Sequence, residues 1–507
     1  MDLEVPGAQT GGLISPIKGH SHANRLKVDV REYTALQRPL DLLIKNGAIV
    51  TPTDMYSADV AIADGKIVAI GKETHLQGAG QLINAEGKFL LPGVIDTHVH
   101  FRDPGFPQRE DFESGSRAAA AGGITMVVDM PNSVPTVVEP DTVKTKAETC
   151  ERKSLVDFGL YGGAGTHSLG KIKAVADAGV LAFKTLLANY PTPGREPEFV
   201  GLHLEKDESL IDVSKEVAKT GMVHVFHAET DFLIRHEVER LKGMGRTDPV
   251  AHVESRPAYA EVDAISRIVM VGREYNDKVH IAHMSSEGGT DLIRAKKSQG
   301  TRVTAETCAH YLLMTRKYME TLGTRAKIQP PLRDPSDQAA LWQGLKDGTI
   351  DSICCDHSPF TEEEKNRDIW QALPGAPDME NMVPLMLNSV NEGRLSLNRL
   401  AEVSSANPAK IFGIYPRKGT IQVGSDADIT VVDLKAKKQI SSEAMETRAR
   451  KHTIFDGWRV TGWPVSTIVR GNVVMRDGHV VGKPGTGRWI TRSETADKDR
   501  KVFSWKR

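Results

Sequence analysis

The sequence VIDTHVHF, residues 94–101, is the first of eight short runs of β-branched and apolar residues in the middle of the chain. The other seven are ITMVVDM (124–130), VDFGLYGG (156–163), LAFKTLLA (181–188), MVHVFHAE (222–229), VHIAHMSS (279–286), RVTAETCAH (302–310) and DSICCDHS (351–358). Helix-length stretches such as VDAISRIVMVGREY (262–275) separate these runs. Buried strands that alternate with helices are typical of a parallel sheet, and eight of them predict an α/β fold of the (β/α)8 TIM-barrel type.

Short alternating strands with glycine turns lie on both sides of this central region. LLIKNGAIVTP (42–52) and QLINAEGKFLLPG (81–93) precede it, and KGTIQVGSDADITVVDL (418–434) follows it. We expect these two pieces to pair into a small β-sandwich domain built from both chain ends. The predicted divisions are a flexible N-terminal extension (1–40), a β-sandwich domain (41–92 plus 416–485), a catalytic barrel (93–415) and a C-terminal tail (486–507).

Composition and charge exclude some classes of partner. The 507 residues include 65 Lys and Arg against 66 Asp and Glu, so no overall field favours nucleic acid or a membrane surface. No segment is typical of a signal peptide or a membrane span. The four cysteines show no CxxC pattern, which favours a reducing, cytoplasmic location. We expect a small-molecule partner. Cys354 and Cys355 are expected in the core, with a metal or redox role left open. Residues 188–200 are expected to form a loop beside the active site.

Histidine and aspartate residues follow several predicted strands at their carboxyl ends, where a barrel builds its active site. His98 and His100 lie two residues apart on one strand, so they point the same way and can bind one metal ion. His227 ends the fifth strand, His283 the sixth and Asp356 the eighth. Any one of them alone is more commonly a hydrogen-bonded core residue. Five at the mouth of one barrel predict a metal site.

Lys184 lies in the fourth run with apolar neighbours on both sides. Burial favours the neutral amine, and a neutral amine beside two metal ions can take up carbon dioxide as a carbamate that bridges them. The alternative is a lysine that extends to solvent at the strand end. We expect two divalent ions to share a bridging hydroxide that attacks an amide carbonyl, with Asp356 passing the proton from water to the leaving nitrogen.

The motifs PGVIDTHVHFRDPG, FKTLLA, FHAE, AETCAHYL and NPAKIFGIYPRKGTIQVGSDADI resemble the cyclic amidohydrolases of the amidohydrolase superfamily, over about residues 41 to 485. That group contains hydantoinases (dihydropyrimidinases), dihydroorotases and allantoinases. The resemblance implies two metal ions, most commonly zinc with manganese or cobalt as substitutes, and a homotetramer or homodimer. It makes His98 and His100 ligands of one metal, Lys184 the carbamylated bridge, His227 and His283 ligands of the second, and Asp356 both ligand and proton shuttle.

Substrate motifs disagree within the group. Arg102 and Asn132 are similar to the dihydroorotase residues that hold a ring carboxylate, for which an arginine fork is well suited. A structural ion pair of Arg102, for instance with Asp103 or Glu110, is the alternative. Two features differ from dihydroorotases: Gln329 stands where they tend to have Asn, and CDHSPF lacks the second histidine that many of them carry after the proline. The C-terminal part is most similar to hydantoinases, whereas SRPAYAEVDAI is similar to allantoinases.

We therefore predict a hydantoinase-like hydrolase of cyclic amides or ureides that prefers a ring with a carboxylate. Arg102, Asn132 and Gln329 are its predicted substrate-binding residues. Dihydroorotase and allantoinase activities are the enzyme alternatives. A scaffold protein that has lost its metal ligands is the non-enzyme alternative, which the complete ligand set disfavours.

Overall fold

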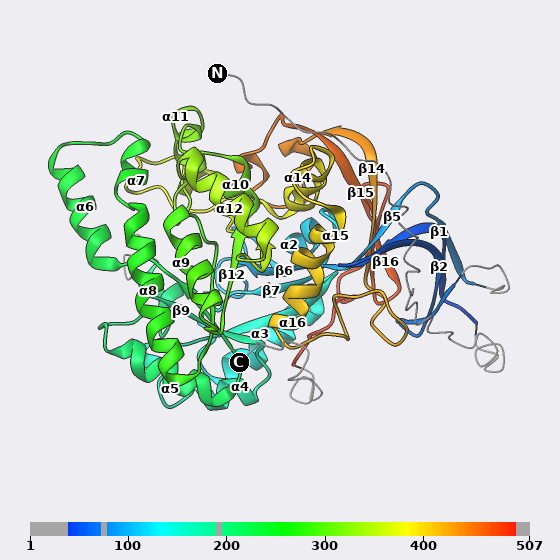
Figure 1. Ribbon diagram of the computed structural model, residues 1–507, viewed down its shortest axis with the longest axis horizontal. Helices are drawn as coiled ribbons and strands as arrows, with labels where there is room; N and C mark the ends of the chain where they lie inside the picture. Colours follow the sequence, from blue (N-terminus) through cyan, green and yellow to red (C-terminus); the bar gives the residue numbers. More distant parts are fainter. Residues whose placement is uncertain (1–38, 72–78, 189–194, 493–507) are drawn as a thin grey trace, which may run out of the picture. The chain divides into compact units, whose positions relative to one another are not determined.

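The computed structural model describes residues 39–71, 79–188 and 195–492 (Figure 1). Eight strands form one parallel sheet in sequence order: β6 (Val94–Val99), β7 (Ile124–Asp129), β8 (Asp157–Gly163), β9 (Ala182–Leu186), β10 (Val223–His227), β11 (Lys278–Ile281), β12 (Val303–Cys308) and β13 (Ser352–Cys354). Val99 pairs with His357 just after β13, and the His100 N–H donates to the His357 carbonyl at 2.8 Å. First and last strands therefore meet, which confirms the predicted (β/α)8 barrel.

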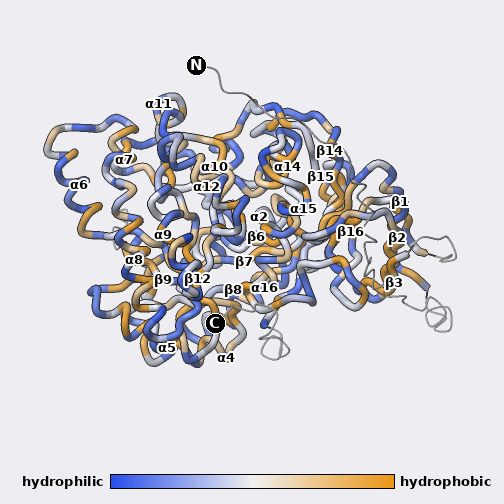
Figure 2. Tube along the Cα trace, in the orientation of Figure 1, coloured by the Kyte–Doolittle hydropathy of each residue, from blue (hydrophilic) through white to orange (hydrophobic). Residues whose placement is uncertain are grey.

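Helices follow the barrel strands along the chain and lie outside the barrel (Figure 1). In order they are α2 (Phe112–Ala121), α3 (Pro140–Lys153), α4 (Ile172–Asp177), α5 (Ser209–Thr220), α6 (Asp231–Gly243), α7 (Val250–Glu254), α8 (Ala258–Tyr275), α9 (Glu287–Ser298), α10 (Ala309–Leu313), α11 (Tyr318–Leu322), α12 (Pro335–Asp347), α13 (Glu362–Lys365), α14 (Met379–Asn391), α15 (Leu397–Ala401) and α16 (Asn407–Ile411). Hydrophobic and hydrophilic residues alternate along them (Figure 2). In α8 the buried residues Ala264, Ile265 and Ile268 recur at helical spacing, so one side packs on the barrel.

Both chain ends contribute to a second sheet of nine strands within the described residues. Its strands are β1 (Leu42–Val50), β2 (Met55–Ala63), β3 (Lys66–Gly71), β4 (Gln81–Asn84), β5 (Phe89–Pro92), β14 (Ile429–Gln439), β15 (Arg459–Val469), β16 (Asn472–Arg476) and β17 (His479–Val480). Antiparallel pairing of β5 with β14 joins the two halves, with Ile429 opposite Pro92. The two β pieces therefore pair as expected, in one continuous sheet.

A buried charge cluster joins this sheet to the barrel. The Lys418 ammonium lies 2.5 Å from Asp157 at the start of β8 and 2.6 Å from Asp428 beside β14. Asp426 lies 3.1 Å from the same ammonium. The three aspartates could by their spacing hold a cation, but Lys418 already supplies the positive charge, so the cluster is a structural joint.

The predicted terminal segments are described only in part. Residues 1–38 of the N-terminal extension and 493–507 of the C-terminal tail lie outside the described residues. From the tail, Arg488 and Ile490 hydrogen bond to the backbone of Phe158 in β8. No described helix has both the length and the apolar character needed to cross a membrane.

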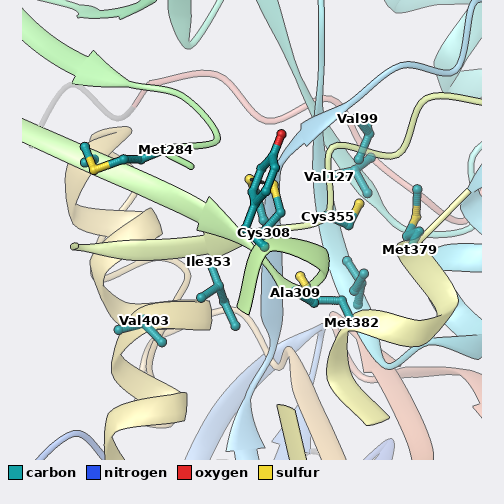
Figure 3. Packing of buried hydrophobic residues seen from close by; sticks show 14 of the residues in the cluster. Val99, Val127, Met284, Cys308, Ala309, Ile353, Cys355, Met379, Met382 and Val403 are labelled. Carbon is teal, nitrogen blue, oxygen red and sulfur yellow. Dashed lines mark hydrogen bonds between the residues drawn. The ribbon is translucent and has the colours of Figure 1, made fainter. Parts of the chain in front are cut away.

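All four cysteines are free and buried, and Cys308 and Cys354 have their sulfur atoms 3.5 Å apart on neighbouring strands. Figure 3 shows Cys308 and Cys355 among apolar residues such as Val99 and Ile353. Burial raises the pKa of the Cys354 and Cys355 thiols well above the usual value. A buried thiol with a raised pKa is inert, so the core role predicted for these residues fits the structure.

Candidate active site

One cavity lies at the carboxyl ends of the barrel strands. It is lined by all nine predicted site residues: His98, His100, Arg102, Asn132, Lys184, His227, His283, Gln329 and Asp356. The described part of the predicted loop at residues 188–200 also lines the cavity, through Ala188, Arg195 and Phe199. The barrel thus collects in one place residues that are up to 258 positions apart in the sequence, from His98 to Asp356.

His98, His100 and Asp356 form the first polar group. The Asp356 Oδ1 atom lies 3.5 Å from His98 Nε2 and 3.1 Å from His100 Nε2. Burial alone would raise the pKa of the Asp356 carboxyl, but the surrounding histidines hold that pKa below its usual range. Donor atoms of all three residues lie within 4.8 Å of one another, close enough to bind a common ion.

His227 and His283 form the second group. His227 Nδ1 lies 3.1 Å from His283 Nε2, and the ring centroids are 4.8 Å apart. Burial lowers the pKa of both imidazoles. Both rings are therefore neutral at neutral pH, the form in which histidine binds metals.

Lys184 lines the same cavity from β9. Its side chain is 3% exposed, and Nζ has no hydrogen-bond partner among the described residues. Burial lowers the Lys184 pKa to about 8. The alternative in which this lysine reaches solvent is therefore wrong, because the amine points into the cavity.

In three of the histidines, one ring nitrogen contacts a side-chain oxygen that fixes the ring. His98 Nδ1 lies 2.7 Å from Glu306, His100 Nδ1 lies 2.7 Å from Asn132, and His227 Nε2 lies 2.8 Å from Glu229. Such contacts fix the ring orientation and direct the other nitrogen into the cavity. The sequence analysis missed Glu306 and Glu229, although both lie close to a strand end in the motifs AETCAH and FHAE.

Three non-glycine residues of the cavity have left-handed backbone conformations. The φ angles are +60° at Arg102, +35° at His283 and +49° at Asp356. Side chains with a Cβ adopt this region at a cost in free energy, and such strain concentrates at functional sites. The strain falls here on three residues that the sequence had already singled out.

Arg102 makes an ion pair, as the alternative expected, but with neither of the two residues given as examples. Its guanidinium binds Glu198 at 3.0 Å and Ser358 at 2.7 Å, whereas Asp103 binds Lys153 and Glu110 accepts from Thr447. Glu198 lies on the 3-10 helix η2 (Glu196–Phe199), 96 residues further along the chain. No short-range pattern indicates this pair, because the loop after β9 alone brings Glu198 to the cavity.

Gln329 lies against a second arginine of the cavity. With its amide oxygen toward Arg256, Gln329 accepts from Nη2 at 2.8 Å and from Nε at 3.3 Å. Arg256 also pairs with the buried Glu229 that holds His227. The Gln329 amide NH2 is thereby turned away from Arg256.

Comparison with known proteins places this barrel and cavity in a family. The family described as "Amidohydrolase family" matches residues 89–474, most of the chain. The chain belongs to the amidohydrolase family.

Several curated relatives of this amidohydrolase are similar over nearly their whole length. The L-hydantoinase of Paenarthrobacter aurescens is 37% identical and covers 89% of this chain and 98% of its own. An allantoinase of Solibacter usitatus is 36% identical over 88% of this chain and 96% of its own. A dihydroorotase of Methanothermobacter thermautotrophicus is 36% identical over 86% of this chain and 94% of its own. The structure of L-hydantoinase from Arthrobacter aurescens has a TM-score of 0.86 at 37% identity and covers 89% and 100% of the two chains. The chain is an enzyme, a hydrolase of the cyclic-amide class.

Members of this family are metal-dependent, and the donor set of the cavity fits metal ions. Four imidazoles, the Asp356 carboxylate and the unpartnered, buried Lys184 amine converge on this one cavity. Nitrogen and oxygen donors of this kind suit zinc and similar divalent ions.

Proposed function

We propose that this amidohydrolase is hydantoinase-like and opens the amide C–N bond of a hydantoin or dihydropyrimidine type ring that bears an acidic substituent. The observation that carries the proposal is the shared cavity: four histidines, Lys184 and Asp356 face the same space as the Arg102 guanidinium. The similarity to the L-hydantoinase supports the ring class.

In this proposal the residues of the cavity hold two divalent ions, most commonly zinc in this group. His98 and His100 would hold one, His227 and His283 the second, and Asp356 would be a further ligand. Lys184 would bridge both as a carbamate, for which its unpartnered, buried Nζ is suited. The ions would supply an attacking water of lowered pKa and a polarised substrate carbonyl.

Asp356 has the proton-transfer role in the proposed reaction. Its carboxylate accepts the proton of the attacking water and returns it to the ring nitrogen as the C–N bond breaks, because an amide nitrogen leaves only when protonated. Arg102 and the Asn132 amide NH2 line the same cavity and would orient the ring. Asn132 also holds His100 through its oxygen, so it connects substrate binding to the proposed metal ligand.

A hydrolysis panel tests the ring. Dihydroorotate, dihydrouracil, hydantoin, 5-carboxymethylhydantoin and allantoin would be offered to protein loaded with zinc, manganese or cobalt. We expect 5-carboxymethylhydantoin to be opened faster than hydantoin. Preferred turnover of dihydroorotate or of allantoin would replace the proposal with the corresponding alternative, and turnover of none would contradict it.

Arg102→Met tests the acidic substituent. A charged hydrogen bond contributes roughly 1.5 to 3 kcal/mol, so this variant should lose that much transition-state binding for acidic rings and much less for neutral rings. Equal loss on both kinds of ring would mean that Arg102 acts only as the structural partner of Glu198.

Metal analysis separates the enzyme from a scaffold protein. We expect two divalent ions per chain in the purified protein, whereas less than one would favour the scaffold. By similarity to its group we also propose a homotetramer or homodimer, which light scattering would measure.

A further inference from the structure

The geometry points to Arg195 as a second guanidinium that recognises the anionic substituent of the substrate, beside Arg102. This inference rests on the proposed function and extends it to a residue that the sequence analysis did not single out. Arg195 immediately precedes η2, is 6% exposed and lines the cavity. It would select the charge of the substrate and take no part in bond cleavage.

The evidence begins with the charge balance around Glu198. Three guanidinium groups, those of Arg102, Arg109 and Arg195, gather at this fully buried carboxylate. The only other carboxylate that the described residues add to the cluster by ion pairing is Glu364, which binds Arg109. Three positive charges thus face two negative ones. A site that retains one uncompensated positive charge in a buried setting favours an anionic ligand.

The hydrogen-bond capacity of Glu198 is fully used. Its Oε1 accepts from Arg109 at 2.7 Å and from Arg195 Nε at 3.1 Å, and its Oε2 accepts from Arg102 at 3.0 Å and from Arg195 Nη2 at 2.9 Å. Burial would raise the Glu198 pKa, but the arginines lower it to about 2. The carboxylate therefore stays charged and serves as a fixed anchor for the arginines.

Donors remain for a ligand after this anchoring. The buried Arg102 Nε has no partner, and Arg195 reaches Glu198 only through Nε and Nη2, which leaves its Nη1 without a partner among the described residues. Arg102 Nε is enclosed by protein, whereas Arg195 lines the cavity, so its unused Nη1 is the donor that a ligand carboxylate could bind. Two guanidinium groups side by side can bind one carboxylate through several charged hydrogen bonds.

Both side chains are also held in a fixed plane. The guanidinium carbons of Arg102 and Arg195 lie 5.2 and 5.0 Å from the centroid of the Phe360 ring. The Arg195 guanidinium carbon also lies 4.8 Å from the centroid of the Phe199 ring. Such stacking removes the conformational freedom that arginine would otherwise lose on binding. Arg109 shares Glu198 and Phe360 but does not line the cavity, so it provides a matched control.

The experiment uses two rings of nearly equal shape, 5-carboxymethylhydantoin and its neutral amide, 5-carbamoylmethylhydantoin. We expect R195Q to lower kcat/KM for the acid roughly ten- to hundred-fold, mainly through KM, and to change the amide less than about three-fold. R195K, which keeps the charge but loses the fork, should be intermediate. R109Q removes a charge of the cluster but no donor of the cavity, so it should lower the acid-to-amide ratio clearly less than R195Q does.

Equal losses of R195Q on both rings, or the same change of ratio in R109Q, would overturn the role of Arg195. Calorimetric binding of the acid gives a readout that is independent of turnover. If the wild type binds the acid but opens neither ring, the proposed function fails and Arg195 is judged on binding alone. In that case, equal affinity of wild type and R195Q for the acid would overturn the inference.

Discussion

The Nδ1 atom of His98 lies 2.7 Å from Glu306 Oε1; both side chains are buried, and only His98 lines the cavity. Glu306 also accepts from the Thr97 hydroxyl at 2.7 Å. Glu306→Gln removes the negative charge that keeps His98 Nε2 directed at the metal site. We expect metal affinity to fall about ten- to hundred-fold while the fold is retained, measured by competition with a chelator.

Glu380→Gln serves as the control for Glu306, because Glu380 is buried on α14 and does not line the cavity. It should leave metal affinity unchanged. An unchanged affinity in Glu306→Gln as well would mean that this carboxylate only supports the barrel interior.

Lys184→Met replaces the unpartnered buried amine by an apolar side chain of similar length. A polar group buried without a partner costs free energy, so we expect the metal-free variant to have the same or a higher Tm than the metal-free wild type. Its metal content should nevertheless fall below one ion per chain, since the bridging carbamate is lost. A 13C signal from labelled bicarbonate should be present in the wild type and absent in the variant. Full metal content in Lys184→Met would contradict a bridging role.

Much of this architecture follows from the sequence because it depends on short-range patterns. The strand runs are apolar and end in polar residues, so His98, His227 and Asp356 could be placed at strand ends before their distances were known. Arg195 and Glu198 could not, because a loop without regular pattern carries them to the cavity. Arg102, which pairs with Glu198, is 96 residues away, and no periodicity indicates such a pairing.

For the same reason, the sequence did not predict the contacts of the C-terminal tail or the charge cluster around Lys418. Arg488 and Ile490 bind the β8 backbone through main-chain groups, which leave no composition signal. Lys418 is one of many charged residues in the sequence, and only the folded chain surrounds it with aspartates. Long-range polar contacts are therefore where sequence patterns lose predictive value, whereas periodic apolar segments keep it.

Glu380 should give the protein a pH-dependent stability. Burial raises the pKa of its carboxyl from 4.5 to about 8, despite hydrogen bonds from two backbone N–H groups. The folded state thus binds a proton that the unfolded state releases above pH 4.5. The stabilisation is complete below that pH and is lost as pH rises toward 8, by roughly 5 kcal/mol.

Glu380→Gln mimics the protonated side chain at every pH. Its free energy of unfolding, measured with urea, should therefore change less between pH 5 and 8 than that of the wild type. The two proteins should differ little near pH 5, and the variant should be the more stable one at pH 8. Parallel stability curves over that range would show that Glu380 is ionised in the folded protein.

Lys418→Met should destabilise the chain strongly, because it leaves Asp157 and Asp428 buried with one cation fewer. Breaking a buried ion pair typically costs about 3 to 5 kcal/mol, and these aspartates are at most 3% exposed. The surrounding carboxylates raise the Lys418 pKa although burial opposes this, so the lysine is charged throughout the neutral range. Urea unfolding would measure the loss.

Lys66→Met is the matched control, since Lys66 pairs with Asp426 of the same cluster but is 45% exposed. An exposed ion pair contributes less than about 1 kcal/mol, so this variant should unfold near the wild-type midpoint. Because the cluster lies at the first residue of β8, at the end of the strand opposite the cavity, folded Lys418→Met should retain wild-type metal affinity. Equal destabilisation by both variants would mean that burial of Lys418 adds nothing to the joint between barrel and sheet.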